Sequence, residues 1–179
     1  MSTKTSNQLI LNSLQSLSEP IHVQGASPSL AAYIISKWLN QDPKQLLCLA
    51  PDFDQAKQLS RDIRSFLYSM NAQDHIECDL VPFFDQSPYG GIYPSIRLLF
   101  DRAHLLSKLA FDGQKARILV GTPLALSQKT IPKSLFLEVC TKLRVGDEVS
   151  SLSSICEQLH RMGYRSADIV EDPGTYSLR

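Results

Sequence analysis

Four short apolar runs alternate with segments of helical periodicity over the first 132 residues. The apolar runs, which have the length and composition of strands, are 21–23, 45–50, 76–80 and 117–121. A strand followed by a helix and another strand forms a βαβ unit, in which the two strands are parallel. The alternation therefore predicts an α/β domain with a parallel sheet and flanking helices on both faces. The second run is almost continuously apolar, which favours burial on both faces of the sheet.

Three of the predicted helices begin at recognisable caps. Ser27 and Thr122 are each followed by proline, a residue favoured at the first helical position. Asp52, with Gln55 three residues later, forms a capping box. The helix between the third and fourth strands carries an apolar stripe that we expect to face the core: Ile96, Leu99, Ala103, Leu106 and Leu109.

The pattern changes at about residue 133 and favours a small α+β domain. The first predicted element is a strand over 139–145. A helix over 152–162 follows, with a capping box at Ser154 and Glu157 and with Gly163 as its C-terminal cap. Two further strands are predicted over 165–170 and 175–179. The sequence therefore predicts two domains, 1–132 and 133–179. The second is expected to be truncated, because its last strand runs to the final residue.

The first strand–loop–helix has the context of a phosphate-binding loop but lacks its chemistry. Counted from Gly25, the pattern G-x-x-x-x-G-K-[ST] needs glycine, lysine and a hydroxyl where the chain has Leu30, Ala31 and Ala32. The lysine neutralises the β- and γ-phosphates, and the hydroxyl holds Mg²⁺. We therefore predict a P-loop-NTPase-like domain whose degenerate loop binds no nucleotide. Weak anion binding at the helix N-terminus and an ordinary strand–helix turn remain alternative interpretations.

Composition excludes several classes of function. The 18 basic and 18 acidic residues balance, so the chain has no overall positive charge for nucleic acid binding. The four cysteines lack C-x-x-C spacing, which predicts buried thiols in a reducing compartment and no metal site. No apolar run reaches the roughly 18 residues of a membrane span, and the N-terminus lacks a signal pattern. The sequence predicts a soluble, cytoplasmic protein without catalytic residues of its own.

Two segments resemble one known family. Residues 81–89, V-P-F-F-D-Q-S-P-Y, followed by Pro94 and Arg102, resemble the "P-x-W-E-x-L-P-Y…P…R" segment of bacterial transcription-repair coupling factors. Residues 163–179, G-Y-R-S-A-D-I-V-E-D-P-G-T-Y-S-L-R, are similar to that family's "G-Y-x-R-V-D-x-V-E-x-P-G-E-F-A-V-R". Both segments belong to the family's N-terminal module, which is homologous to the excinuclease component UvrB and has lost its phosphate loop. The chain departs from these patterns at Phe84, Asp85, Ser87 and Thr175.

The resemblance implies a recruitment role in nucleotide excision repair. Full-length coupling factors displace a stalled RNA polymerase with an ATP- and Mg-dependent DNA translocase, and their polymerase and double-stranded DNA contacts lie beyond residue 179. The N-terminal module recruits the excinuclease component UvrA, and Arg179 matches an arginine of that contact surface. This chain is accordingly expected to be non-catalytic and to need no cofactor. A solvated charge at a strand end is the alternative interpretation of Arg179.

Two other functions are weighed against recruitment. A helicase-like ATPase domain would need a lysine near Pro28, and none occurs between Lys4 and Lys37. A direct DNA-binding module could stack bases on the aromatic side chains of Phe83, Phe84, Tyr89 and Tyr93. No basic residue lies between Asp79 and Ser95 to neutralise phosphates, so packing of this loop against the sheet is favoured.

Overall fold

The computed structural model describes residues 20, 22–84, 91, 94–112, 115–148 and 151–178. Its elements, in chain order, are α2 (Pro28–Gln41), β1 (Gln45–Leu49), α3 (Phe53–Ser69), β2 (Ile76–Leu80), α4 (Ile96–Phe111), β3 (Ala116–Gly121), α5 (Pro123–Ser127), α6 (Lys133–Val139), α7 (Leu152–Arg161), β4 (Arg165–Ser166) and β5 (Thr175–Tyr176). The chain forms two compact units, Met1–Phe83 with Gln114–Ser127, and Phe84–Gly113 with Gln128–Arg179. The second unit starts at Phe84, and the domain boundary after residue 132 stays a prediction. Within the part of the chain that is described, every helix is too short or too polar to cross a membrane.

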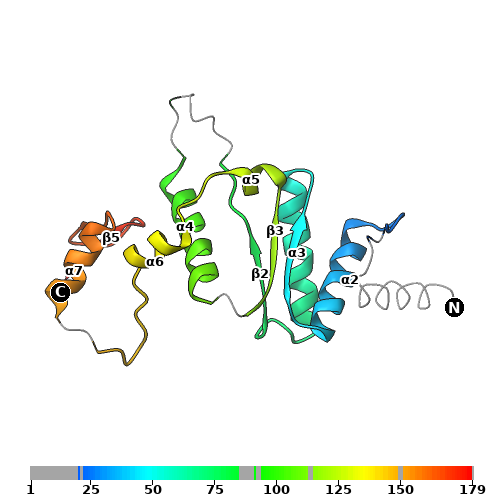
Figure 1. Cartoon of the computed structure of the whole chain (residues 1–179), viewed down its shortest axis with the longest axis horizontal. Coiled ribbons are helices and arrows are strands. Elements are labelled where there is room, and N and C mark those ends of the chain that lie inside the picture. The colour runs from blue at the N-terminus through cyan, green and yellow to red at the C-terminus, as the bar shows by residue number, and fades with distance from the viewer. Residues whose placement is uncertain are drawn as a thin grey trace. The chain divides into compact units, whose positions relative to one another are not determined.

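The first unit is an α/β layer built on a parallel three-stranded sheet. The strand order is β1-β3-β2, and Leu46 of β1 and Cys78 of β2 both pair with Ile118 of β3. Helices α2 and α3 pack on each other and on one face of this sheet (Figure 1). The core between them includes Leu39, Ile63 and Ile118, all completely buried. The predicted α/β class with a parallel sheet is confirmed.

Burial of β1 on both of its faces was a wrong expectation. Side chains alternate between the two faces of a strand, and in β1 the outward-facing Leu47 and Leu49 are 50% and 56% exposed. Of the helices that flank the sheet, α2 and α3 belong to the first unit, whereas α4, which follows β2, belongs to the second. A continuous apolar run thus predicted the strand correctly and its surroundings incorrectly.

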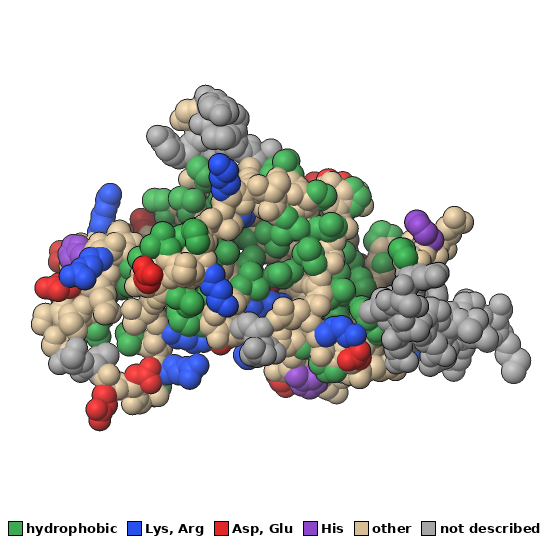
Figure 2. All heavy atoms as spheres, viewed as in Figure 1, with side chains coloured by type: hydrophobic (Ala, Val, Ile, Leu, Met, Phe, Trp, Pro, Cys, Tyr) green, Lys and Arg blue, Asp and Glu red, His purple; other side chains and the backbone are tan. Residues whose placement is uncertain are grey.

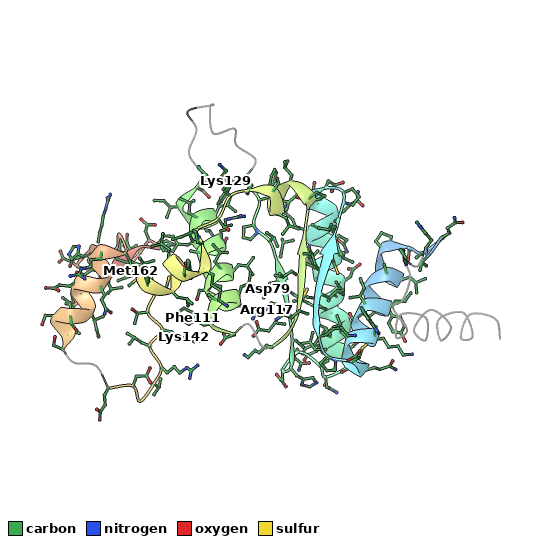
Figure 3. All side chains as sticks on the ribbon, in the orientation of Figure 1. Asp79, Phe111, Arg117, Lys129, Lys142 and Met162 are labelled. Carbon is green, nitrogen blue, oxygen red and sulfur yellow. The ribbon has the colours of Figure 1, made fainter. Side chains whose placement is uncertain are left out.

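The face of the sheet opposite the Ile118 core carries a buried ion-pair network. Arg117 of β3 is 3% exposed, and its guanidinium contacts the carboxylates of Glu77 at 2.6 Å and Asp79 at 3.3 Å. Arg117 and Asp79 point toward each other across neighbouring strands (Figure 3). Lys115 approaches the other oxygen of Glu77 at 3.4 Å. These contacts compensate the cost of burying a guanidinium in the sheet.

The three predicted helix caps of the first unit are confirmed. Asp52 accepts a hydrogen bond from the backbone N–H of Gln55 at 2.8 Å, which is the N-cap bond of the predicted capping box. The Gln55 side-chain amide donates to the Asp52 carboxylate at 2.6 Å, in place of the capping-box bond to the Asp52 backbone N–H. Ser27 caps α2, with Pro28 as the first helical residue. The hydroxyl oxygen of Thr122 accepts from the N–H of Ala125 at 3.1 Å at the start of α5. Local capping rules therefore located three helix starts.

The predicted buried stripe of α4 is wrong in its first half. Ile96 and Leu99 are 61% and 46% exposed and Ala103 is exposed, whereas Leu106 and Leu109 are partly buried. The buried residues of the helix are Arg102 and Leu105. The guanidinium of Arg102 bonds to the side chain and backbone of Gln128, so this helix buries an arginine beside a leucine. A hydrophobic pattern cannot identify a buried face that includes a charged side chain with an apolar stem.

The second unit also differs from its predicted elements. Val139 lies in helix α6, which takes up the start of the expected strand 139–145, and residues 140–148 have no regular structure. Helix α7 is confirmed, but its cap is Ser151, whose hydroxyl oxygen accepts from the N–H of Ser154 at 3.1 Å. Gly163 adopts a φ of +87°, as expected of a helix-ending glycine. The two expected C-terminal strands shrink to β4 and β5, two residues each and parallel.

Candidate functional site

The segment before α2 is not the strand that a phosphate loop requires. Residues 22–24 are irregular and exposed, and residue 21 lies outside the described residues. The expected strand 21–23 is therefore wrong where it can be examined. Three residues form few ladder hydrogen bonds, and His22 and Gln24 alternate with the apolar positions. The strand–loop–helix context of a nucleotide site is incomplete at its first element.

One end donor of the first turn of α2 is already used, and another is missing. The N–H of Leu30 donates to the Ser27 hydroxyl at 3.2 Å, and Pro28 has no N–H. A phosphate at a helix N-terminus is held by end donors of this kind. The N–H of Ala31, which donates to the Ser27 carbonyl at 3.0 Å, makes the first hydrogen bond within the helix. Gly25 keeps the left-handed φ of +74° that a loop glycine allows, and a Cβ atom added there would have no atom within 4 Å.

Position 32, where a magnesium-binding hydroxyl would be required, is a core position. Ala32 is completely buried in the cluster between α2, α3 and the sheet. Its carbonyl accepts a hydrogen bond from the Ser36 hydroxyl at 2.8 Å. Ala31 and Leu30 are partly buried. A methyl group at position 32 therefore serves packing, and a larger polar side chain would have to displace core atoms.

A carboxylate lies beside the same helix turn. The Ser29 hydroxyl donates to Asp62 Oδ2 at 2.9 Å, and the Gln58 side-chain amide donates to Asp62 Oδ1 at 2.7 Å. Asp62 belongs to α3, so the negative charge reaches the α2 N-terminus from the neighbouring helix. The favourable helix dipole at this end thus already has an anionic partner. The sequence did not predict a role for Asp62, because this residue lies 33 positions from Ser29 and no local pattern links the two.

Arg179, the predicted partner-binding residue, lies outside the described residues, whereas the motif that leads to it is described. The N–H of Arg165 donates to the Gly174 carbonyl at 2.9 Å, and the N–H of Ala167 donates to the Tyr176 carbonyl at 2.8 Å. Gly174 has a φ of +86° and sits against the ring of Phe100. The segment 163–178 is therefore folded around these backbone hydrogen bonds, and Arg165 is exposed on it.

The aromatic loop is described only at its start. The ring of Phe83 lies 6.1 Å from that of Phe53 in α3, and Phe84 is half-buried beside Arg102, whose guanidinium is 5.3 Å from its ring centre. These contacts support the packing interpretation for the two residues. Tyr89 and Tyr93 lie outside the described residues.

The four cysteines differ in burial. All four are free thiols; Cys48 and Cys78 are buried, as predicted, whereas Cys140 and Cys156 are partly exposed. Burial, with a smaller contribution from Cys78, raises the pKa of Cys48 to about 12, so this thiol is not a nucleophile at neutral pH. Among the described residues, no three His, Cys, Asp or Glu side chains are grouped to hold a metal ion.

The sequence is similar to several known proteins. No protein-family model matches the sequence. The chain is 25% identical over 159 residues to the transcription-repair-coupling factor of Myxococcus xanthus and 31% identical over 160 residues to that of Staphylococcus haemolyticus. The Staphylococcus epidermidis factor is 30% identical over 164 residues. The chain is homologous to the N-terminal region of transcription-repair-coupling factors.

These matches confirm the resemblance carried by the two sequence motifs. The match to the Myxococcus xanthus factor covers 89% of this chain, and the chain spans 13% of the length of that relative. The same proportions hold for the Staphylococcus haemolyticus factor. The homology thus extends over both compact units.

Proposed function

We propose that this chain is a non-catalytic recruitment module of a transcription-coupled repair factor, and that it binds the excinuclease component UvrA. Two observations support the proposal: homology to transcription-repair-coupling factors over 89% of the chain, and the folded segment 163–178 that leads to Arg179. In a complete factor, a separate ATP- and Mg-dependent translocase would act on double-stranded DNA and RNA polymerase. The proposed place of action is the cytoplasm.

The single observation that carries the non-catalytic part is the state of the α2 N-terminus. The position of the phosphate-binding lysine is Ala31, the position of the hydroxyl is the buried Ala32, and Asp62 adds a negative charge. A phosphate charge about 5 Å from that carboxylate is repelled by about 3 kcal/mol at an effective dielectric constant of about 20. The absence of a lysine removes attraction for phosphate, and the Asp62 carboxylate adds repulsion. Both effects weaken nucleotide binding, so the first unit is proposed to bind no nucleotide.

Titration calorimetry with ATP and Mg²⁺ tests this part. We expect no saturable heat at ATP concentrations up to about 1 mM, which corresponds to a binding free energy weaker than about −4 kcal/mol. An Asp62→Asn variant serves as the matched control, because it keeps a hydrogen-bonding side chain and removes the charge. Micromolar binding by the unaltered chain would contradict the proposal and favour the ATPase interpretation.

The partner-binding part rests on Arg179. A guanidinium can bond a carboxylate through two parallel hydrogen bonds, and arginines are common among the residues that dominate interface energies. A version of the chain extended by about 50 residues, the length of a small domain, would present the whole predicted contact surface. We propose that it retains purified UvrA in a pull-down experiment, and that Arg179→Ala weakens the complex at least about tenfold, as expected for a hot-spot arginine.

Arg97→Ala provides the matched control, because Arg97 is an exposed arginine of α4 in the second unit. Equal binding by the two variants would remove Arg179 from the contact surface. Failure of the extended chain to retain UvrA at micromolar concentrations would remove the recruitment function itself.

Direct DNA binding has less support. The formal net charge is zero, and basic and acidic side chains are interspersed on the face shown in Figure 2. Binding through phosphates requires clustered basic side chains and weakens steeply with salt. A salt-dependent shift of a DNA duplex at micromolar protein would therefore favour that function over recruitment.

A further inference from the structure

The second compact unit consists of two separate chain segments that are fastened at their first residues. The chain enters the unit at Phe84, leaves it after Gly113 and re-enters it at Gln128. The side-chain amide of Gln128 donates to the Phe84 carbonyl at 2.9 Å, and its oxygen accepts from the Phe84 N–H at 3.4 Å. One glutamine thus bonds both backbone groups of a residue 44 positions away.

Arg102 of α4 adds a third side chain to this junction. Its guanidinium donates to the Gln128 carbonyl at 3.3 Å and to the Gln128 side-chain oxygen at 3.5 Å. The same guanidinium lies over the Phe84 ring, 5.3 Å from the ring centre. Arg102 is 9% exposed, so the cation–π contact forms largely out of water, where such contacts are strongest.

The two chain segments already approach each other at the end of the sheet. The N–H of Val81, which follows β2, donates to the carbonyl of Val120 in β3 at 2.8 Å. Three residues after Val81 and eight after Val120, the Phe84–Gln128 bonds join the same two segments again. An amide side chain that pairs with both backbone groups of another residue replaces one rung of a strand ladder.

We propose that Phe84, Arg102 and Gln128, here called the Phe84 clasp, are a conformational device that fixes the start of one chain segment of the second unit to the start of the other. The two segments also meet further along α4, where Phe100 packs against Tyr164, Lys142 pairs with Asp112 at 2.9 Å, and Leu106 and Leu109 border a small cavity with Phe136 of α6. Those contacts join side chains, whereas the clasp bonds the backbone of one residue. Opening the clasp therefore frees Phe84 from α4 while α4 and α6 stay in contact. This inference does not depend on the proposed partner or on Arg179.

Hydrogen exchange of the Phe84 amide, measured by NMR on the full chain, tests the clasp. Gln128→Ala removes the acceptor of this N–H, and the net value of one hydrogen bond predicts about a three- to tenfold faster exchange. Arg102→Ala should accelerate the same amide by a similar factor. The double variant should exchange no more than about twofold faster than either single variant, because residues of one network are coupled.

Lys129→Ala is the matched control, because Lys129 follows Gln128 and is exposed (Figure 3). The fluorescence of the single tryptophan, Trp38, verifies that the first unit remains folded in each variant. Should Gln128→Ala unfold the chain, Gln128→Asn, whose amide is one methylene too short to reach, takes its place. Exchange within twofold of Lys129→Ala, or single-variant effects that multiply in the double variant, would overturn the proposal.

Discussion

Gly174 offers a prediction whose size follows from the structure. Its φ is +86°, and a Cβ atom at this position would lie 2.9 Å from Phe100 Cζ and 3.3 Å from Cε2. Alanine in the left-handed region costs about 1–2 kcal/mol. The Phe100 ring cannot move freely away, because it packs edge-on against Tyr164 at 6.0 Å. Forcing a methyl group into such packing costs a further ~1–3 kcal/mol, so Gly174→Ala should destabilise this segment by about 2–5 kcal/mol.

Gly163→Ala separates the two contributions. Gly163 has nearly the same φ, +87°, but no atom lies within 4 Å of its Cβ position, so this variant carries only the backbone cost of about 1–2 kcal/mol. Exchange of the Ala167 amide, which donates to the Tyr176 carbonyl at 2.8 Å, reports opening of the segment. We expect Gly174→Ala to accelerate this exchange at least about fivefold more than Gly163→Ala, which is the lower end of the packing cost.

Phe100→Ala in the Gly174→Ala background should remove that difference, since the obstructing ring is gone. Equal acceleration by the two glycine variants, or no recovery in the double variant, would refute the packing argument. Either result would mean that the backbone conformation alone accounts for the glycine.

Three further predictions concern charge and protonation. Arg117→Met breaks a buried ion-pair network and should lower the unfolding free energy of the first unit by about 3 kcal/mol, measured by urea denaturation; an unchanged midpoint would contradict this. With the pKa of Cys48 at about 12, about one thiol in ten thousand is ionised at pH 8, so iodoacetamide should label the partly exposed Cys156 and leave Cys48 unlabelled in the folded chain, as read by mass spectrometry. Hydrogen bonds from Gln55 hold the pKa of Asp52 below its ordinary value, so the stability this carboxylate adds is present above its unfolded pKa and is lost as the pH falls through the lower folded pKa. Asp52→Ala should therefore unfold more easily than the unaltered chain at neutral pH but not in strong acid, and a constant difference across that range would count against the cap.

Features set by neighbouring residues were predictable from the sequence. The Asp52 cap and the Thr122 cap each join residues three positions apart, and both form as predicted. The strands β1, β2 and β3 also lie where apolar runs of strand length occur. These features can be predicted because the residues that determine them are neighbours in the sequence.

Features set by distant residues were not predictable. The buried face of α4 depends on Gln128, which receives the guanidinium of Arg102 from 26 residues away. The expected strand 139–145 failed because a helix incorporated its first residue, although Val139 and the residues after it have strand-like composition. An apolar pattern indicates that a face is buried somewhere but not which element covers it.

The candidate nucleotide site shows why several changes at one place carry more weight than one missing lysine. A loop that had lost only its lysine would keep free donors at the helix N-terminus and room near position 32. Here the Ser27 hydroxyl occupies the N–H of Leu30, Ala32 is completely buried, and Asp62 supplies an anion from α3. Each feature stabilises the α2–α3 pair without a ligand, so the first unit needs no phosphate to hold this helix end in place. The exposed turn is thus held by contacts between α2 and α3, with Ala32 as its buried anchor.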